Sequence, residues 1–227
     1  MIKKLIRIEE LTLTLDEDEK LIEWKILKIL NIKKEELLNF EIVKKAVDSR
    51  DKSRILFVYS LNINTNNNEK LLESKNSIFL KNSKKHKIRL IEPFVYKIDK
   101  IDKNKVEHRP VIIWSGPSWL LAWTILAEAW LNPIILERWS EVKQRVIDVY
   151  NLFTKREFKK NSNVQFWEWW AGTFSDGKLY TLVNDPRSKY IFEEFVAAWA
   201  PEEIIYSARP HIGTDRLRWV VRNMRKK

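Results

Sequence analysis

Alternating apolar and polar residues mark three predicted strands in the first third of the chain. Leu5–Leu15 (LIRIEELTLTL) alternates with a period of two, which is typical of a strand with one buried face. Phe40–Val47 and Ile55–Ile63 are rich in isoleucine, valine, phenylalanine and tyrosine, which favour strands. The polar stretch Asp48–Arg54 between them predicts a hairpin connection.

A helical period appears between the first two of these strands. Asp16, with Glu19 three residues later, is typical of an N-terminal capping box, and the apolar period that follows predicts a helix to about Leu30. Lys33–Leu38 predicts a short helical turn, and the asparagine-rich stretch Asn62–Asn68 predicts a loop. The order β-α-β-β indicates a small α+β domain of the ferredoxin-like kind.

The second half of the chain has a different order of elements. Pro110–Ile113 predicts a strand, Leu120–Ala129 a helix and Asn132–Glu137 a second strand. Both strands are continuously apolar and a helix lies between them, so we expect a parallel βαβ unit. A loop is expected at Asn161–Lys178. Further helices are predicted at Glu141–Phe153, Pro186–Ala198 and Asp215–Met224.

Glycine and tryptophan divide the chain in two. Residues 1–105 contain no glycine and one proline, whereas residues 106–227 hold all four glycines and ten of the eleven tryptophans. We therefore expect a small α+β domain with a lysine-rich linker over 1–105. Residues 106–227 are expected to hold an α/β, Rossmann-like domain. Average usage near 7% would give about 16 glycines. The chain has only four, fewer than its eleven tryptophans.

Composition excludes several classes of protein. With 44% hydrophobic and 32% charged residues the chain is neither disordered nor fibrous. It has no apolar run near the roughly 20 residues that cross a bilayer, and its first residues do not form a secretory signal. The chain has no cysteine, and its three histidines are scattered, so we expect no metal site. These features predict a soluble cytoplasmic protein and leave its oligomeric state open.

The formal net charge of +11 does not by itself predict a nucleic-acid partner. A nucleic-acid surface usually gathers its basic residues in one block or on one face. Here acidic residues are interleaved with basic ones, and the densest basic stretches are 81–87 and 222–227. Nucleic acid is therefore not the expected partner.

The segment RPVIIWSGPSW, from Arg109 to Trp119, carries the candidate chemistry. It runs from a strand through a tight loop into a helix, where dinucleotide-binding folds place G-x-G-x-x-G. The three glycine positions hold Trp114, Gly116 and Trp119. Glu137 follows the second strand about 20 residues on, where an acidic residue binds the ribose hydroxyls. The fingerprint is complete except for two glycines, and both are tryptophan.

Other tryptophans also stand where glycine has a physical reason. Trp130 and Trp199 each follow a predicted helix, at the position that favours a left-handed residue. We hypothesise that ten tryptophans, all except Trp24, represent glycine, because some bacterial lineages read the UGA codon as glycine while common variant tables read it as tryptophan. Adding ten to the four glycines present gives 14, close to average usage. With indoles at Trp114 and Trp119 we expect the chain not to retain FAD.

A competing interpretation takes the tryptophans as real. Trp167, Trp169 and Trp170, with Phe166 and Phe174, could then stack on sugars or on single-stranded nucleic acid. That surface would not explain tryptophan at two helix ends and two fingerprint positions.

With glycine at those positions, the chain resembles the FAD-dependent dehydrogenases of bacteria, within the NAD(P)/FAD-dependent oxidoreductases. The resemblance runs from about Phe40 to the C-terminus and is strongest from Arg109 onward. It rests on RPVIIWSGPSWLLAWTILAEAWLNPIILERW, NVQFWEWWAGTFSDGKL, DPRS, APEEI and PHIGTDRL, of which the AGTFSDGKL segment is the most specific.

The resemblance implies FAD as cofactor, NAD(P)H as a possible electron donor and a small-molecule redox substrate. It implies a pyrophosphate cradle at Ser115, Gly116, Pro117 and Ser118, between the glycine positions Trp114 and Trp119. Glu137 would hold the ribose and Arg138 would lie near the adenine. In the loop 171–178, residues Gly172, Thr173, Gly177 and Lys178 would approach the flavin. The family continues beyond residue 227, so the chain is expected to be an N-terminal fragment, inactive alone.

No catalytic side chain is predicted, because the flavin performs the chemistry in such enzymes. His211 is expected to orient a loop, and Asp176 and Asp185 to accept hydrogen bonds in turns. Two other functions stay open. One is a non-catalytic basic module that contacts RNA or an acidic partner, and the other is a dinucleotide enzyme that uses NAD or a methyl donor.

Overall fold

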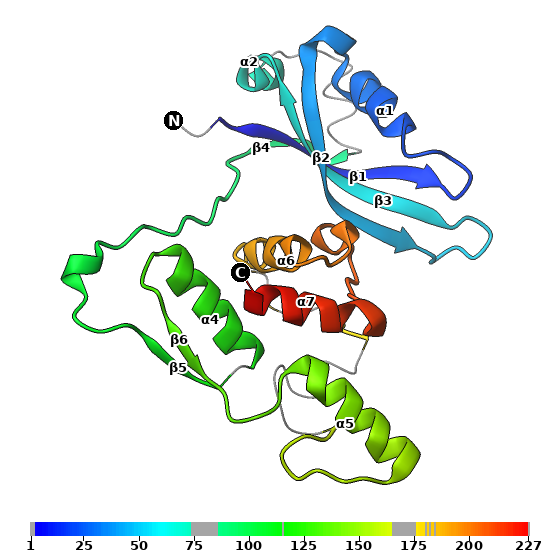
Figure 1. Cartoon of the computed structure of the whole chain (residues 1–227). Helices are drawn as coiled ribbons and strands as arrows, with labels where there is room; N and C mark the ends of the chain where they lie inside the picture. The colour runs from blue at the N-terminus through cyan, green and yellow to red at the C-terminus, as the bar shows by residue number, and fades with distance from the viewer. Residues whose placement is uncertain are drawn as a thin grey trace. The chain divides into compact units, whose positions relative to one another are not determined.

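The computed structural model forms two compact units (Figure 1). The first comprises Met1–Val95 with Ile205–Ala208, and the second comprises Tyr96–Ile204 with Arg209–Lys227. The change in composition lies at residue 105, within the second unit. The structure describes residues 3–73, 86–114, 116–164, 176–179, 181, 183 and 185–226.

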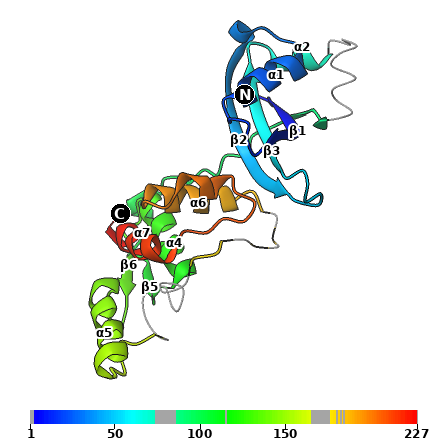
Figure 2. The same cartoon turned by 90° about the vertical axis from the view of Figure 1, so that its right-hand side faces the viewer.

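The described residues of the first unit include a four-stranded antiparallel sheet and the helices α1 and α2 (Figures 1 and 2). The strand order is β2-β3-β1-β4, and every pair of neighbours is antiparallel. The predicted order β-α-β-β is confirmed, and α2 and β4 follow it among the described residues. The elements are β1 (Leu5–Thr14), α1 (Leu21–Leu30), η1 (Lys34–Glu36), β2 (Leu37–Asp48), β3 (Leu56–Thr65), α2 (Asn68–Glu73) and β4 (Arg89–Ile91).

A bulge in β1 keeps its apolar residues on one face. Ile6 and Ile8 are buried, and so are Leu11 and Leu13, but two residues rather than one lie between Ile8 and Leu11. The register with β3 shifts between Ile8 and Leu11, and Glu10 takes a left-handed φ of 63° there. The extra residue restores the alternation, so all four side chains join the core under α1.

Two local predictions in this unit are wrong. Asp16 does not cap α1, because the chain turns first and the helix begins at Leu21. Asp18 instead accepts a hydrogen bond from the Lys20 amide at 2.8 Å.

The asparagine-rich stretch is not a loop throughout, since β3 continues to Thr65 and α2 begins at Asn68. Asn68 is buried. Its Oδ1 accepts from the Thr65 amide and hydroxyl, each at 2.7 Å, and its Nδ2 donates to the Lys4 carbonyl at 2.6 Å.

The second unit contains the predicted parallel βαβ unit. β5 and β6 pair in parallel, with Val111 opposite Ile134 and Ile113 opposite Leu136, and α4 connects them. The three later helices are also found. The elements are η2 (Lys103–Lys105), β5 (Val111–Ile113), α4 (Pro117–Glu128), β6 (Ile134–Leu136), α5 (Val142–Lys155), α6 (Ser188–Ala197), η4 (Glu202–Ile205) and α7 (Thr214–Lys226).

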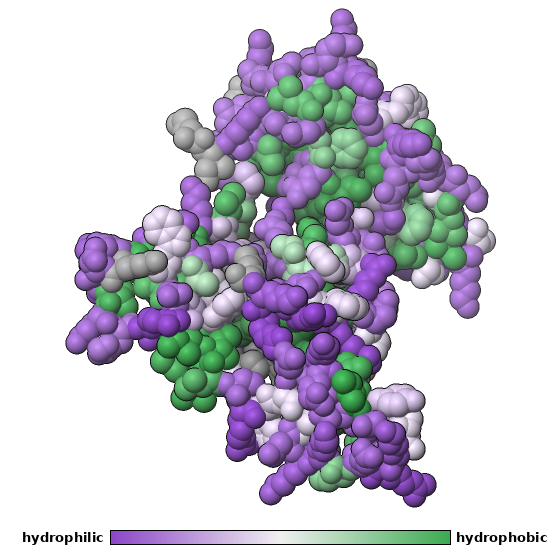
Figure 3. All heavy atoms as spheres, in the orientation of Figure 1, coloured by the Kyte–Doolittle hydropathy of each residue, from purple (hydrophilic) through white to green (hydrophobic). Residues whose placement is uncertain are grey.

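Helix α7 holds this unit together. It contacts α4, α5 and α6, and its Leu217, Val220, Val221 and Met224 are buried. The β5–β6 pair is covered less completely. Val111, Ile113 and Leu136 are exposed, and Figure 3 shows apolar side chains gathered over this pair of strands. Among the described residues, none of the helices has the length and apolar character needed to cross a membrane.

Candidate functional site

The candidate site lies at the carboxyl ends of β5 and β6. The Trp114 amide donates to the Leu136 carbonyl at 2.8 Å, so the parallel pairing continues to the start of the loop. Gly116 is the N-cap of α4, Pro117 follows at the first helical position, and the Leu120 amide donates to the Gly116 carbonyl at 3.0 Å. The N-terminal amides of a helix carry partial positive charge and bind phosphate groups. This loop therefore has the geometry of an anion-binding turn.

Trp114 has the backbone conformation of the glycine that the fingerprint demands. Its φ is 93°, in the left-handed region that glycine adopts at little cost and that other residues adopt under strain. Its side chain is 38% exposed. The structure thus gives the first fingerprint position a physical requirement for glycine, although the residue present is tryptophan.

Trp119, at the third fingerprint position, lies in the first turn of α4. A Cβ atom placed on Gly116 would lie 3.6 Å from Cδ1 of Trp119, so the indole leans against the loop. The side chain is half exposed. The fingerprint requires a small residue here so that the helix can pack on its strand and leave the loop open.

An open cavity of about 470 Å³ adjoins the loop. Glu137 and Arg138 follow β6 directly and contribute the charged groups. Glu137 Oε1 accepts from the Trp139 amide at 2.9 Å, and the Arg138 guanidinium lies 4.3 Å from the centre of the Trp139 ring. The cavity is lined by Ile113, Trp114, Leu136, Glu137, Arg138 and Trp139.

A second cavity of about 390 Å³ shares Glu137 and Trp139 with the first. Arg225 of α7 reaches it and forms an ion pair with Glu141 at 2.5 Å. Arg225 hydrogen-bonds Glu141 and lowers the pKa of that carboxyl. No sequence pattern predicts this pair, because Glu141 at the N-cap of α5 and Arg225 of α7 are far apart in the chain. The other lining residues are Leu120, Trp123 and Ile135.

The polar groups fit a dinucleotide, but the indoles do not. A helix N-terminus, a carboxylate and a guanidinium lie together at the edge where such folds bind pyrophosphate and ribose. Trp114 lines the cavity beside the loop. Trp119 lies over Gly116 of the loop.

Two helix ends also have a tryptophan at a position that favours glycine. At the end of α4, the Leu131 amide donates to the Leu126 carbonyl at 3.0 Å and the Trp130 amide donates to Ala127 at 2.9 Å. This is a Schellman motif with Trp130 at its left-handed position, at φ 68°.

The end of α6 is built in the same way. The Ala200 amide donates to Phe195 at 2.9 Å and the Trp199 amide donates to Val196 at 2.9 Å. Trp199 has φ 80°, and its side chain is 70% exposed. Glycine is the usual residue at this position of the motif. Both helix ends therefore have the left-handed residue that the sequence predicts.

The described end of the AGTFSDGK loop lies against the segment that contains His211. The Ile212 amide donates to the Gly177 carbonyl at 3.1 Å. Gly177 has φ 64°, and a Cβ atom there would lie 3.3 Å from atoms of Ile212 and of Leu217. Close packing therefore requires this glycine. Lys178 pairs with Asp176 at 3.2 Å on the surface.

The structure thus brings together seven of the twelve predicted site residues at one edge of the β5–β6 pair. They are Trp114, Gly116, Pro117, Ser118, Trp119, Glu137 and Arg138. Gly177 and Lys178 lie on the separate segment 176–179, which is hydrogen-bonded to residues 210–213 before α7. Ser115, Gly172 and Thr173 lie outside the described residues, as do Trp167, Trp169 and Trp170.

His211 and Asp185, which were expected to have structural roles, lie in loop and turn segments. His211 is exposed and forms a β-bridge with Lys178, which agrees with a loop-orienting role. Asp185 accepts from the Arg187 amide at 2.8 Å and pairs with its guanidinium, and these hydrogen bonds lower the pKa of Asp185 to about 2. Asp185 is therefore a turn residue. The described part of the chain contains no cluster of acidic or histidine side chains that could hold a metal.

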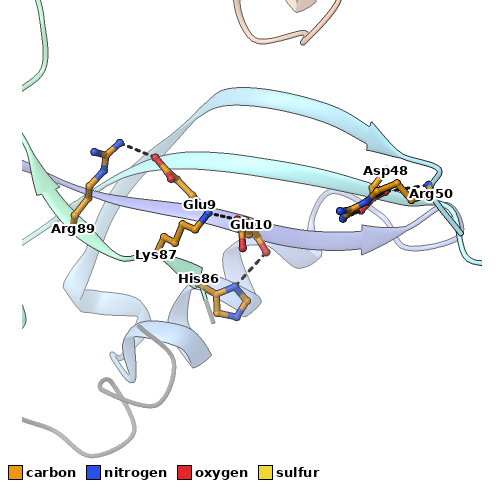
Figure 4. Close-up of polar contacts among 7 residues, drawn as sticks. All are labelled: Glu9, Glu10, Asp48, Arg50, His86, Lys87 and Arg89. Atoms are coloured by element: carbon orange, nitrogen blue, oxygen red, sulfur yellow. Dashed lines mark hydrogen bonds and ion pairs between the residues drawn. The ribbon is translucent and has the colours of Figure 1, made fainter. Parts of the chain in front are cut away.

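At one edge of the first unit, basic side chains of the described residues form ion pairs with acidic side chains (Figure 4). Lys87 pairs with Glu10 at 2.6 Å, and Arg89 pairs with Glu9 at 2.8 Å. The hydrogen bond from Lys87 lowers the pKa of Glu10. Exposed pairs like these contribute little to stability. They do show that positive charge at 86–89 is balanced locally.

Comparisons with known proteins add family relations but no activity. A family model described as a domain of unknown function, DUF8436, matches residues 5–64, which run from β1 through β3. An uncharacterized protein of Clostridium beijerinckii (strain ATCC 51743 / NCIMB 8052) is 37% identical over 221 residues. The match covers 97% of this chain and 40% of the relative, so the chain spans less than half of that protein.

Proposed function

We propose that this chain is the N-terminal part of an FAD-dependent oxidoreductase and binds the dinucleotide at the β5–α4–β6 unit. The observation that carries the proposal is the parallel pair with a glycine-capped helix N-terminus on one strand and Glu137 directly after the other. Ligands of open α/β sheets bind outside the carboxyl ends of the strands. The polar groups of this site meet at that edge.

Each group at the site has a separate task. The amides at the start of α4 would hold the pyrophosphate, Glu137 would accept hydrogen bonds from the adenosine ribose, and Arg138 would lie at the adenine end. The bound flavin would supply hydride or electron transfer between NAD(P)H and a small-molecule substrate. The residues of this chain would bind and orient it.

We also infer that positions 114, 119, 130 and 199 are glycine in the protein as its source makes it. Three of these tryptophans have φ between 68° and 93°, and two occupy the glycine position of a Schellman motif. The fourth lies over the phosphate loop. The codons test this directly, since UGA at these positions would agree with the inference and UGG would overturn it.

Flavin titration tests the cofactor. The chain printed here and a version with glycine at the ten positions would be compared for quenching of FAD fluorescence. We expect binding only by the glycine version, because its loop is open to the pyrophosphate. Glu137→Gln in that version would weaken binding about tenfold, since the ribose would lose a charged acceptor. Equal binding by both chains would contradict the role of the loop.

The longer relative provides a separate test of the function. The Clostridium beijerinckii protein, purified at full length, should carry flavin absorbance. A colourless protein that also fails to bind added FAD would overturn the proposal. RNA binding by the first unit with strong salt dependence would instead favour the basic-module function.

A further inference from the structure

Helix α5 has its charged and apolar residues on the opposite sides from an ordinary surface helix. The charged residues Arg145 and Asp148 are buried on its inward side. Ile147 is exposed on the other side, and Tyr150 and Phe153 are 64% and 73% exposed. A helix at the surface of a domain normally packs its apolar residues against the core and leaves its charged residues in solvent. The outward side of α5 therefore has the composition of a surface that contacts an apolar partner.

The inward charges of α5 have local partners, and these contacts fix which side of the helix faces outward. Asp148 Oδ1 accepts a hydrogen bond from Lys159 Nζ at 2.7 Å and another from Gln144 Nε2 at 3.0 Å. Arg145 Nε donates to the Asn163 carbonyl at 3.2 Å. Charged groups are buried at acceptable cost only when they are paired or hydrogen-bonded. A rotation of α5 that buried its apolar side would break these contacts, so they hold the apolar residues at the surface.

The outward apolar residues form one stripe along α5. Residues three or four positions apart lie on the same side of a helix, and this spacing joins Val146, Ile147, Tyr150 and Phe153. These four residues are here called the α5 stripe. Phe158, two residues beyond the C-cap of the helix, is also exposed. Contiguous apolar residues at a protein surface mark a site of contact with a partner.

Basic side chains accompany the α5 stripe. Lys143 lies about one helical turn before Ile147, on the same side of the helix, and is exposed. Three more exposed basic residues stand at the C-terminal end of the helix and just beyond it, and they are Lys155, Arg156 and Lys160. Glu157 is the one exposed acidic residue from 143 to 160, a range that the structure describes throughout. The stripe is therefore flanked by net positive charge.

These charges favour an anionic surface over a second copy of the chain. Two α5 stripes packed antiparallel would bring Lys143 of one copy toward Lys155 and Arg156 of the other, and parallel packing would bring each basic residue toward its equivalent. Like charges that meet at an interface cost free energy. An anionic lipid bilayer would instead attract all the basic residues and accept the apolar side chains. Aromatic side chains combined with lysine and arginine are typical of helices that lie in the bilayer interface.

We propose that α5 is a peripheral membrane contact for bilayers that contain anionic phospholipid. The α5 stripe lies at the boundary between headgroups and acyl chains, and the basic side chains beside it pair with lipid phosphate groups. The ring of Tyr150 enters the apolar part of the bilayer while its hydroxyl stays among the headgroups. This contact goes beyond the proposed flavin chemistry and does not depend on a bound cofactor.

Vesicle sedimentation with the full chain tests the contact. One set of vesicles contains phosphatidylcholine alone, and the other contains phosphatidylcholine with about a quarter of phosphatidylglycerol. We expect binding to the mixed vesicles to be at least about tenfold tighter and to weaken as salt is added, because the lipid charge attracts the basic residues. Failure to bind the mixed vesicles, or equal binding to both compositions, would overturn the proposal.

A matched pair of phenylalanine variants separates the α5 stripe from other exposed aromatic residues. Phe153→Ser should weaken binding to the mixed vesicles about tenfold, since it removes an inserted ring. Phe94 is also exposed, at 52%, and lies outside α5, so Phe94→Ser should change binding by less than about twofold. Equal losses from the two variants would show that exposed rings adhere to lipid wherever they lie, and the proposal would fail.

A matched pair of lysine variants does the same for charge. Lys155→Gln and Lys20→Gln give chains of equal net charge, and both lysines are exposed. Lys155→Gln should weaken binding to the mixed vesicles about fivefold, and Lys20→Gln by less than about twofold. Equal losses would assign binding to net charge alone and would contradict the proposal.

Sedimentation velocity without lipid tests the other occupant of the α5 stripe. We expect Phe153→Ser to leave the oligomeric state of the chain unchanged, because the basic residues oppose pairing of two stripes. A dimer of the parent chain that Phe153→Ser dissociates would assign the stripe to a second copy and overturn the membrane contact.

Discussion

The two units bury the apolar residues of their sheets to different extents. In the first, eleven buried residues form one apolar cluster between the sheet and α1, including Tyr59, Leu61 and Ile63. In the second, the parallel strands have one poorly covered face, and Ile113 is 74% exposed. Parallel sheets are normally covered on both faces. The first unit buries its sheet within its own residues, whereas the second leaves apolar strand residues at its surface.

The two units also differ in the residues that take a left-handed backbone conformation at helix ends. α1 of the first unit ends at Asn31, with φ 51°, and asparagine tolerates this conformation. α4 and α6 of the second unit end at Trp130 and Trp199, which do not. The left-handed residue after α1 therefore suits its backbone conformation, whereas the left-handed residues after α4 and α6 are tryptophans at positions that favour glycine.

The largest expected effect tests the difference between the cores. Leu61→Ala should lower the free energy of unfolding by about 3 kcal/mol, because the side chain is fully buried in the cluster. Ile113→Ala should change it by at most about 0.5 kcal/mol, because that side chain is exposed. Urea unfolding of the full chain, followed by circular dichroism, measures both. Equal losses would show that the β5–β6 face is buried in solution.

Gly177→Ala tests tight packing in the second unit. The new Cβ would lie 3.3 Å from Ile212 and Leu217, at a φ of 64°. We expect a loss of about 2 kcal/mol from strain and crowding together. Gly116→Ala is the matched control. Its φ is −68°, and the new Cβ would lie 3.6 Å from Cδ1 of Trp119, so this variant should lose less than half as much. A larger loss at Gly116 would refute this explanation.

Asp148 tests a buried charge of the second unit by pH. Burial alone would raise its pKa, but hydrogen bonds from Lys159 and Gln144 lower it below the ordinary value of 3.8. Its contribution is therefore present above about pH 4 and is lost as the pH falls through the lowered pKa.

Asp148→Asn should cost about 1.5 kcal/mol at pH 7 and remove this part of the acid sensitivity. Thermal unfolding at pH 7 and at pH 3 measures the difference. A variant as acid-sensitive as the parent would show that other carboxyls are responsible.

Two tryptophans with equal exposure test the smallest expected effect, that of a left-handed backbone on stability. Trp24 and Trp130 are each 54% exposed, and each ring has a lysine ammonium within 5 Å, Lys28 at 4.8 Å and Lys100 at 4.1 Å. They differ in backbone conformation, since Trp24 is helical and Trp130 is left-handed.

Trp24→Gly should lower the free energy of unfolding by about 1 kcal/mol, and Trp130→Gly should raise it by about 0.5 kcal/mol. Thermal unfolding of the two variants against the parent chain gives both values. If both substitutions destabilise equally, the left-handed turn does not favour glycine.

Strong periodic patterns predicted most elements correctly. β1, β3, α4 and the parallel pairing of β5 with β6 follow from apolar spacing that each strand or helix carries locally. The errors occurred where side chains had distant alternatives. Glu19 does not cap a helix because it binds Lys45 and Tyr59, and Asn68 does not form a loop because it binds Thr65 and Lys4.

The sequence by itself determined where glycine is needed, because the requirement comes from local backbone geometry at a strand end and at helix ends. That is why Trp114, Trp130 and Trp199 could be identified before their φ values. Only the tertiary structure decided which distant residues meet. The ion pair between Arg225 and Glu141 depends on how the chain folds back, as do the backbone hydrogen bonds of Lys45 with Tyr206 and Ala208. No local spacing records these contacts.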